Sequence, residues 1–87
     1  MAKYRKAPVV VEAVQFMGTK DGIAEALRLL PAELYGDARF GWYLVVETLE
    51  GRMFVKTGDW IVRGARGEYY PVKDVTFRET YTLVEET

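Results

Sequence analysis

The sequence predicts an α+β domain: a small, strongly bent antiparallel sheet or partial barrel of about five to six strands, with one covering helix and a short helical turn near the C-terminus. Short β-branched and aromatic runs recur about every eight to ten residues in the second half, and glycines separate them. One earlier segment has the apolar spacing of an amphipathic helix. With 87 residues in total, residues 1–87 are expected to form a single domain.

The first part of the chain is expected to contain one strand and one helix. Residues 8–16 are mostly β-branched and apolar and are expected to form a strand, and valines on both of its faces predict burial on both sides through part of its length. Asp21 is a candidate N-cap for the helix that follows. The apolar stripe of this helix consists of Ile23, Ala26, Leu27 and Leu30. Pro31 either ends the helix or begins another short turn over residues 31–35.

The second part is expected to form a meander. Its strands are predicted over residues 42–48, 52–56, 60–63 and 68–72. Pro71 cannot donate a ladder hydrogen bond, so it marks a sheet edge or the end of a strand. Residues 73–80 are expected to form a helical turn capped by Asp74, and residues 81–84 a closing strand.

Charge and composition exclude several classes of protein. The chain has 12 basic and 13 acidic residues and a formal net charge of −1, so it has neither the basic excess of a duplex-DNA binder nor the acidic excess of a DNA mimic. No run approaches the roughly 20 apolar residues that a membrane span needs. Cysteine is absent, which fits a reducing compartment. We therefore expect a cytoplasmic location and no contact with a membrane.

Catalysis is not expected, because the side chains that most often perform it are missing. The sequence contains no His, Cys, Ser or Asn, which removes Ser–His and Cys–His nucleophiles and zinc sites built from His and Cys. The carboxylates of Asp59, Glu68 and Asp74 are dispersed along the chain, and the glycines match no phosphate-binding motif. The protein is predicted not to be an enzyme and to need no cofactor or metal.

Several segments together resemble a family of small bacteriophage and prophage proteins of unassigned function, which is named for a PGDYG-type motif. The resemblance rests on residues 3–6, 8–16, 48–51, 58–64 and 67–72, together with Phe77 and Tyr81. This chain has Thr57 where the family usually has proline, and Trp60 where the family has an aromatic residue. The resemblance brings no chemistry with it. It implies a phage-derived gene that is expressed in a bacterial cytoplasm.

A candidate partner-binding region follows from the same segment. Aromatic residues are concentrated between positions 60 and 81, and core packing accounts for most of them. Tyr69 and Tyr70 must point to opposite faces if both lie in a strand, so one of them is expected to reach the surface. Aromatic residues next to arginine are typical of interface hot spots. The candidate binding residues are Asp59, Trp60, Arg63, Arg66, Tyr69, Tyr70 and Lys73.

The leading functional hypothesis is a non-catalytic phage or prophage accessory protein that binds a host or phage protein, for example to inhibit a host enzyme or defence system. Alternatives are a nucleotide-sequestering protein, whose pocket forms in a homodimer, and a module that stacks single-stranded nucleic acid on a β surface. Two further alternatives are a minor virion component or assembly factor and a carboxylate-based enzyme.

Overall fold

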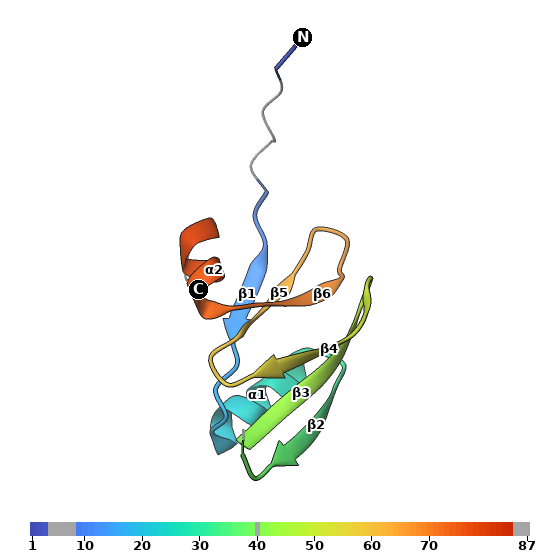
Figure 1. Ribbon diagram of the computed structural model, residues 1–87, viewed down its shortest axis with the longest axis vertical. Helices are drawn as coiled ribbons and strands as arrows, with labels where there is room; N and C mark the ends of the chain where they lie inside the picture. Colours follow the sequence, from blue (N-terminus) through green and yellow to red (C-terminus); the bar gives the residue numbers. More distant parts are fainter. Residues whose placement is uncertain (4–8, 40, 85–87) are drawn as a thin grey trace.

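The computed structural model describes residues 1–3, 9–39 and 41–84. In this part of the chain there are six strands and two helices (Figure 1). The strands are β1 (Glu12–Gln15), β2 (Ala32–Asp37), β3 (Gly41–Thr48), β4 (Gly51–Lys56), β5 (Trp60–Arg63) and β6 (Tyr69–Val72). The helices are α1 (Lys20–Leu29) and α2 (Asp74–Thr80).

The strands form two separate antiparallel sheets. One sheet has the strand order β2-β3-β4 and the other has the order β1-β5-β6. Figure 1 shows α1 beside the first sheet and α2 beside the second, where it follows β6. The predicted α+β class is therefore confirmed. The sheets do not close into a barrel, because β4 is followed by a turn that carries the chain into the second sheet instead of continuing the first.

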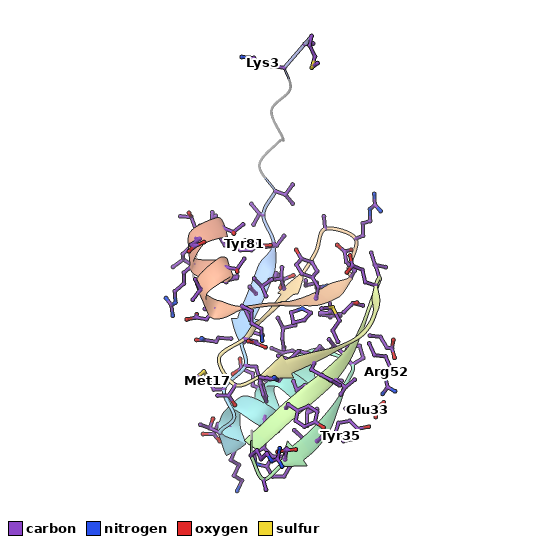
Figure 2. The ribbon with its side chains drawn as sticks, viewed as in Figure 1. Lys3, Met17, Glu33, Tyr35, Arg52 and Tyr81 are labelled. Carbon is purple, nitrogen blue, oxygen red and sulfur yellow. The ribbon has the colours of Figure 1, made fainter. Side chains whose placement is uncertain are left out.

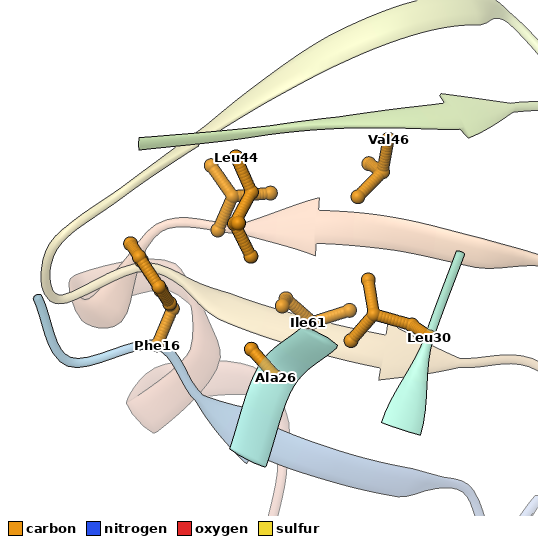
Figure 3. Packing of buried hydrophobic residues seen from close by; sticks show 7 residues of the cluster. Phe16, Ala26, Leu30, Leu44, Val46 and Ile61 are labelled. Atoms are coloured by element: carbon orange, nitrogen blue, oxygen red, sulfur yellow. The ribbon is translucent and has the colours of Figure 1, made fainter. Parts of the chain in front are cut away.

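The core lies between the two sheets and is completed by α1. Leu44 and Val46 of β3 point toward Ile61 of β5, and Figure 3 shows these side chains facing one another across the gap between the sheets. The buried cluster consists of Phe16, Ala26, Leu30, Leu44, Val46, Val55 and Ile61. Burial of these side chains is the main favourable contribution to folding of such a small domain.

The first strand is shorter than predicted. β1 covers only residues 12–15, because its partner in the sheet, β5, is itself four residues long. Val9 and Val10 extend beyond this ladder and are 57% and 74% exposed, so they do not belong to the part of the segment that is buried. Residue 8 lies outside the described residues.

Helix α1 begins earlier than predicted. Thr19, rather than Asp21, is the N-cap, and its hydroxyl accepts a hydrogen bond from the backbone N–H of Gly22 at 3.1 Å. Asp21 lies in the first turn, where a negative charge also suits the helix dipole. Of the predicted apolar stripe, Leu27 is exposed, because the buried face of the helix is narrower than predicted and is centred on Ala26 and Leu30.

Residues 31–35 are not a helical turn, because β2 occupies residues 32–37. Leu34 of β2 pairs with Leu44 of β3 and packs against the core cluster, so tertiary packing decides the conformation of this segment. Proline at position 31 is compatible with this arrangement, because it precedes the strand and has no ladder hydrogen bond to donate.

The described C-terminal segment contains a helix, and the predicted closing strand over residues 81–84 is wrong. These four residues pair with no described strand, and Leu83 and Val84 are exposed. The N-cap of α2 is Lys73, which makes no side-chain cap hydrogen bond. The prediction that Asp74 caps this helix is therefore wrong. The Asp74 carboxylate instead accepts a hydrogen bond from the Arg78 Nε at 2.9 Å, one helical turn further on.

Helix α2 covers the face of the β1-β5-β6 sheet that points away from the core. The Trp60 ring stacks on the Phe77 ring with centroids 3.9 Å apart, and Phe77 stacks on Tyr81 at 4.8 Å. Val62 points to the same side as Trp60 and is fully buried. This sheet is therefore packed on both faces, by the core cluster on one side and by α2 on the other.

Candidate functional site

The residues predicted to bind a partner are divided between two faces of the β1-β5-β6 sheet. In a strand, neighbouring side chains point to opposite faces. Trp60 of β5 and Tyr70 of β6 accordingly face α2, whereas Arg63 and Tyr69, which pair across the same two strands, face the other way. Arg66 is exposed in the turn between these strands. The structure thus does not bring the seven residues together on one surface.

Asp59 stabilises the turn between β4 and β5. Its side chain is buried, at 6% exposure, and accepts a hydrogen bond from the Lys56 backbone N–H at 2.9 Å. The Lys73 ammonium donates to both carboxylate oxygens at 3.2 and 3.3 Å. The turn also requires Gly58, whose φ of +98° is in the left-handed region that glycine adopts without strain. Asp59 is therefore fully engaged within the chain.

Trp60 is held by a polar cluster around Asp74. The Asp74 carboxylate oxygen Oδ1 accepts hydrogen bonds from the Trp60 indole N–H at 2.8 Å and from the Gln15 amide at 3.3 Å. The same Gln15 amide donates to the Gly58 carbonyl at 3.0 Å. These bonds connect β1, β5 and α2. The pKa of Asp74 is lowered, mainly by the hydrogen bond from Trp60 and next by the hydrogen bond from Arg78.

This lowered pKa predicts an acid dependence of stability. Because the folded pKa of Asp74 lies below the unfolded value, the ionised group stabilises the fold above about pH 4, and this contribution is lost as the pH falls through the folded pKa. In urea unfolding followed between about pH 6 and pH 2, Asp74→Asn should show a smaller loss of stability than the wild type in the acid range. Parallel pH profiles for the two proteins would contradict this role of the carboxylate.

Tyr69 and Tyr70 also have internal partners. The Tyr70 hydroxyl lies 3.3 Å from the Tyr81 hydroxyl, and this hydrogen bond, together with partial burial, raises the pKa of Tyr70 to about 12. Tyr69 packs against the core cluster, and the Arg63 guanidinium lies over its ring, 5.9 Å from the centroid. The exposed partner of Arg63 is Glu12, at 3.8 Å. Most of this aromatic area is therefore used in packing.

The outer face of the β2-β3-β4 sheet carries a second group of aromatic residues. Leu44 and Val46 of β3 point into the core, so Tyr43 and Val45 point outward. The registers place Tyr35 of β2 directly opposite Tyr43, and Phe54 of β4 directly opposite Val45. We call Tyr35, Tyr43, Val45 and Phe54 the aromatic face. Its residues come from three adjacent strands of one sheet.

Two of the three rings of the aromatic face are exposed although the rings contact one another. Tyr35 stacks on Tyr43 at 5.7 Å between centroids, and Phe54 meets Tyr43 edge-on at the same distance. Phe54 is still 62% exposed and Tyr35 is 41% exposed, whereas Val45 between them is buried. Together with Arg52, the four residues line a shallow cavity of about 260 Å³. The face is thus an apolar surface with a hollow over Val45.

Charged side chains border one end of the aromatic face. Arg52 lies 3.2 Å from Glu33 and 3.3 Å from Glu47, and Figure 2 shows Arg52, Glu33 and Tyr35 close together beside β2 and β3. The Tyr35 hydroxyl donates a hydrogen bond to Glu33, and this bond raises the pKa of Tyr35. Lys56 lies near the other end, opposite Tyr43 in the register. Because two carboxylates share one guanidinium at the first end, this end of the aromatic face has a net negative charge.

Sequence patterns alone do not single out the aromatic face. They leave a turn over residues 31–35 as one of two alternatives and predict no strand at Tyr35. Every position from 42 to 46 is apolar, so the pattern does not show which side of β3 is buried. The one local signal is Phe54, a large ring between Met53 and Val55 in a strand whose apolar and polar residues do not alternate regularly. Only the register with β2 shows that Tyr35, Tyr43 and Phe54 form one surface.

Comparison with protein-family models, with curated proteins and with solved structures finds no match to this chain. Among the described residues, no helix is long and apolar enough to cross a bilayer. Residues 1–3, 9–39 and 41–84 also contain no group of three or more acidic side chains placed to hold a metal ion. The geometry of the surface is therefore the basis for a functional proposal.

Proposed function

We propose that this protein is a non-catalytic binding module that docks on a partner protein through the aromatic face. In keeping with the family resemblance, we further propose that it is a phage or prophage accessory protein of the bacterial cytoplasm. Its partner would be a host or phage protein, and docking would inhibit or redirect a host enzyme or defence system.

The observation that carries the proposal is the exposure of Phe54 and Tyr35 on a sheet face that no helix covers in the described part of the chain. Antiparallel sheets with one face in water usually carry polar residues on that face. Phenylalanine and tyrosine are instead enriched at the centres of protein interfaces, where they give a large contact area for little loss of side-chain entropy. The hollow over Val45 is a place for an apolar side chain of the partner.

The charges around the aromatic face favour a protein over a nucleic acid. Single strands stack their bases on exposed rings, but their phosphates require a basic groove. Here Glu33 and Glu47 flank Arg52 and share its guanidinium, so this end repels a phosphate chain. We therefore infer that the partner presents an apolar patch with a lysine or arginine at the side that meets Glu33 and Glu47.

The proposal is tested by affinity capture from host lysate with three forms of the protein. Wild type and Val75→Glu should retain the same specific partner, whereas Phe54→Glu should lose it, because a charge would be placed in the centre of the apolar contact. Val75 is the matched control, since it is 68% exposed on α2, away from the aromatic face. All three forms should remain folded, because both substituted side chains are exposed.

The captured protein is then purified and mixed with each form, and binding is measured by calorimetry. We expect Phe54→Glu to weaken binding by more than about 30-fold, as for a hot-spot residue. Equal affinity for wild type and Phe54→Glu would contradict docking through this face. A shift of the isolated wild type from dimer to monomer upon Phe54→Glu would also contradict it, because the face would then be occupied by a second copy of the chain.

A further inference from the structure

Strand β1 lies at the edge of its sheet, and one side of its backbone has no partner in the described part of the chain. The order β1-β5-β6 places β5 on one side of β1, and no described strand pairs with the other side. The Phe16 backbone N–H donates toward β5, to the Asp59 carbonyl at 2.8 Å. Because the hydrogen-bonding groups of successive residues alternate between the two sides of a strand, those of Gln15, Ala13 and Val11 point to the open edge.

The chain that leads into β1 presents apolar side chains to solvent. Figure 1 shows this segment continuing away from the sheet in line with β1. Val9 and Val10 are 57% and 74% exposed, Ala13 is also exposed, and Val11 is half-buried. Valine is enriched in strands, and an exposed apolar strand with an unpaired edge is a template for pairing with another strand.

The other edge strands have features that oppose such pairing. Strand β6 contains Pro71, which has no N–H to donate to a neighbour. Strand β4 carries Arg52 and Lys56, and β2 carries Glu33, so each of these edges presents charged side chains. From residue 9 to the end of β1, by contrast, the single charged residue is Glu12, and there is neither proline nor glycine. The β1 edge is therefore the least protected of the edges in the two sheets.

The order of residues along the β1 edge makes it complementary to a second copy of itself. Two copies of one strand pair antiparallel about a twofold axis. An axis at Val11 sets Val11 opposite itself and Val9 opposite Ala13 of the second copy, so the outward-facing backbone groups meet. The same register sets Val10 opposite Glu12 of the second copy. An axis at Glu12 would instead set two carboxylates opposite each other, which is destabilising.

We infer that two copies of this protein associate through β1, with residues 9–13 of each copy forming an antiparallel ladder centred on Val11. The ladder pairs the open edge and covers the exposed valines, and it joins the two β1-β5-β6 sheets into one. A contact made by one strand pair is in the size class of weak association, so we expect a Kd of about 10–100 µM. The inference does not depend on the proposed docking face, which belongs to the β2-β3-β4 sheet.

The register is tested by placing opposite charges at position 10 and measuring self-association by analytical ultracentrifugation. Val10→Glu should weaken the dimer, because the new carboxylate lies opposite Glu12 of the second copy at both ends of the ladder. Val10→Lys lies opposite the same carboxylate and should dimerise about tenfold more tightly than Val10→Glu. Both variants replace the same exposed side chain, so they lose the same apolar contact. The double variant Val10→Glu, Glu12→Lys should recover the affinity that Val10→Glu loses.

Cysteine substitution gives a second measurement, because the sequence contains no cysteine. Under mild oxidation, Val11→Cys should form a disulfide-linked dimer, since residues opposite each other in a hydrogen-bonded pair have Cα atoms about 5.5 Å apart, within reach of a disulfide. Val84→Cys is the matched control, because Val84 is as exposed as Val10, at 74%, but lies in the C-terminal segment. It should cross-link much more slowly than Val11→Cys.

Phe54→Glu separates this inference from the docking proposal. It should dimerise with the affinity of wild type, although it is expected to lose the captured partner. The inference is overturned if wild type remains monomeric up to about 1 mM, or if Val10→Glu and Val10→Lys dimerise equally well. Dissociation of the dimer by Phe54→Glu, or equal cross-linking of Val11→Cys and Val84→Cys, would also overturn it.

Discussion

Phe16→Ala should lower the free energy of unfolding by about 4 kcal/mol, which is the range found for removal of a buried aromatic side chain. A domain of this size is expected to have a total stability of roughly 9 kcal/mol, so the variant would keep about half of it. Phe16 is 1% exposed and lies in the core cluster, where the chain leaves β1 and turns toward α1.

The backbone of Phe16 adds a further constraint on this position. Its N–H donates to the Asp59 carbonyl and its carbonyl accepts from the Gly58 N–H, both at 2.8 Å, so the cavity left by the ring cannot close by a shift of the chain. Urea unfolding measures the loss, with Val9→Ala as the exposed control, for which a change below about 0.5 kcal/mol is expected. A loss below about 1 kcal/mol for Phe16→Ala would show that the two sheets are not held together at this residue.

Asp59→Ala should lower the free energy of unfolding by about 2 kcal/mol, because it leaves the Lys56 backbone N–H without its acceptor in the β4–β5 turn. The ion pair with Lys73 should contribute little, since the Lys73 side chain is 69% exposed. Lys73→Met therefore should cost less than about 0.5 kcal/mol. Thermal or urea unfolding of both variants checks the comparison.

Asp59→Asn separates the two interactions of this carboxylate. The amide keeps an oxygen that accepts from the Lys56 N–H but has no charge, so an intermediate loss of stability is expected. If Lys73→Met is as destabilising as Asp59→Ala, the ion pair and not the turn hydrogen bond is the important interaction. Asp59 would then stabilise the fold mainly through its charge.

The strands that the sequence predicts correctly are the ones bounded by turns with strong local requirements. Gly51 and Gly58 both have positive φ, at +106° and +98°; Gly51 begins β4 directly after the β3–β4 turn, and Gly58 lies in the turn between β4 and β5. A glycine between two apolar runs is a strong sequence signal for a turn, so these turns can be predicted without the structure. The observed bounds of β5, residues 60–63, match the prediction for this reason.

Where the prediction is wrong, the conformation depends on partners far along the chain. Residues 31–35 are extended because Leu34 pairs with Leu44, and the N-terminal valines leave the sheet because β5 is short. Residues 81–84 carry strand-forming side chains but have no described strand beside them to pair with. Local composition contains none of this information.

The candidate site illustrates the same limit. Trp60 and Tyr70 are expected near a binding surface, and the sequence does not reveal that α2 folds back to place Phe77 and Tyr81 against them. The aromatic face escapes sequence reasoning because Tyr35, Tyr43 and Phe54 are well separated in sequence and meet only through strand register. By contrast, the absence of His, Cys and Ser is read directly from the sequence and does not depend on the fold.

Hydroxyl-radical footprinting of the complex with the captured partner is the most direct measurement of where this protein binds. We expect Tyr35, Tyr43 and Phe54 to lose reactivity upon complex formation, while Val75 on α2 remains unchanged. Unchanged reactivity at the first three residues, with new protection at Trp60, Tyr69 and Tyr70, would contradict docking on the outer face of the β2-β3-β4 sheet.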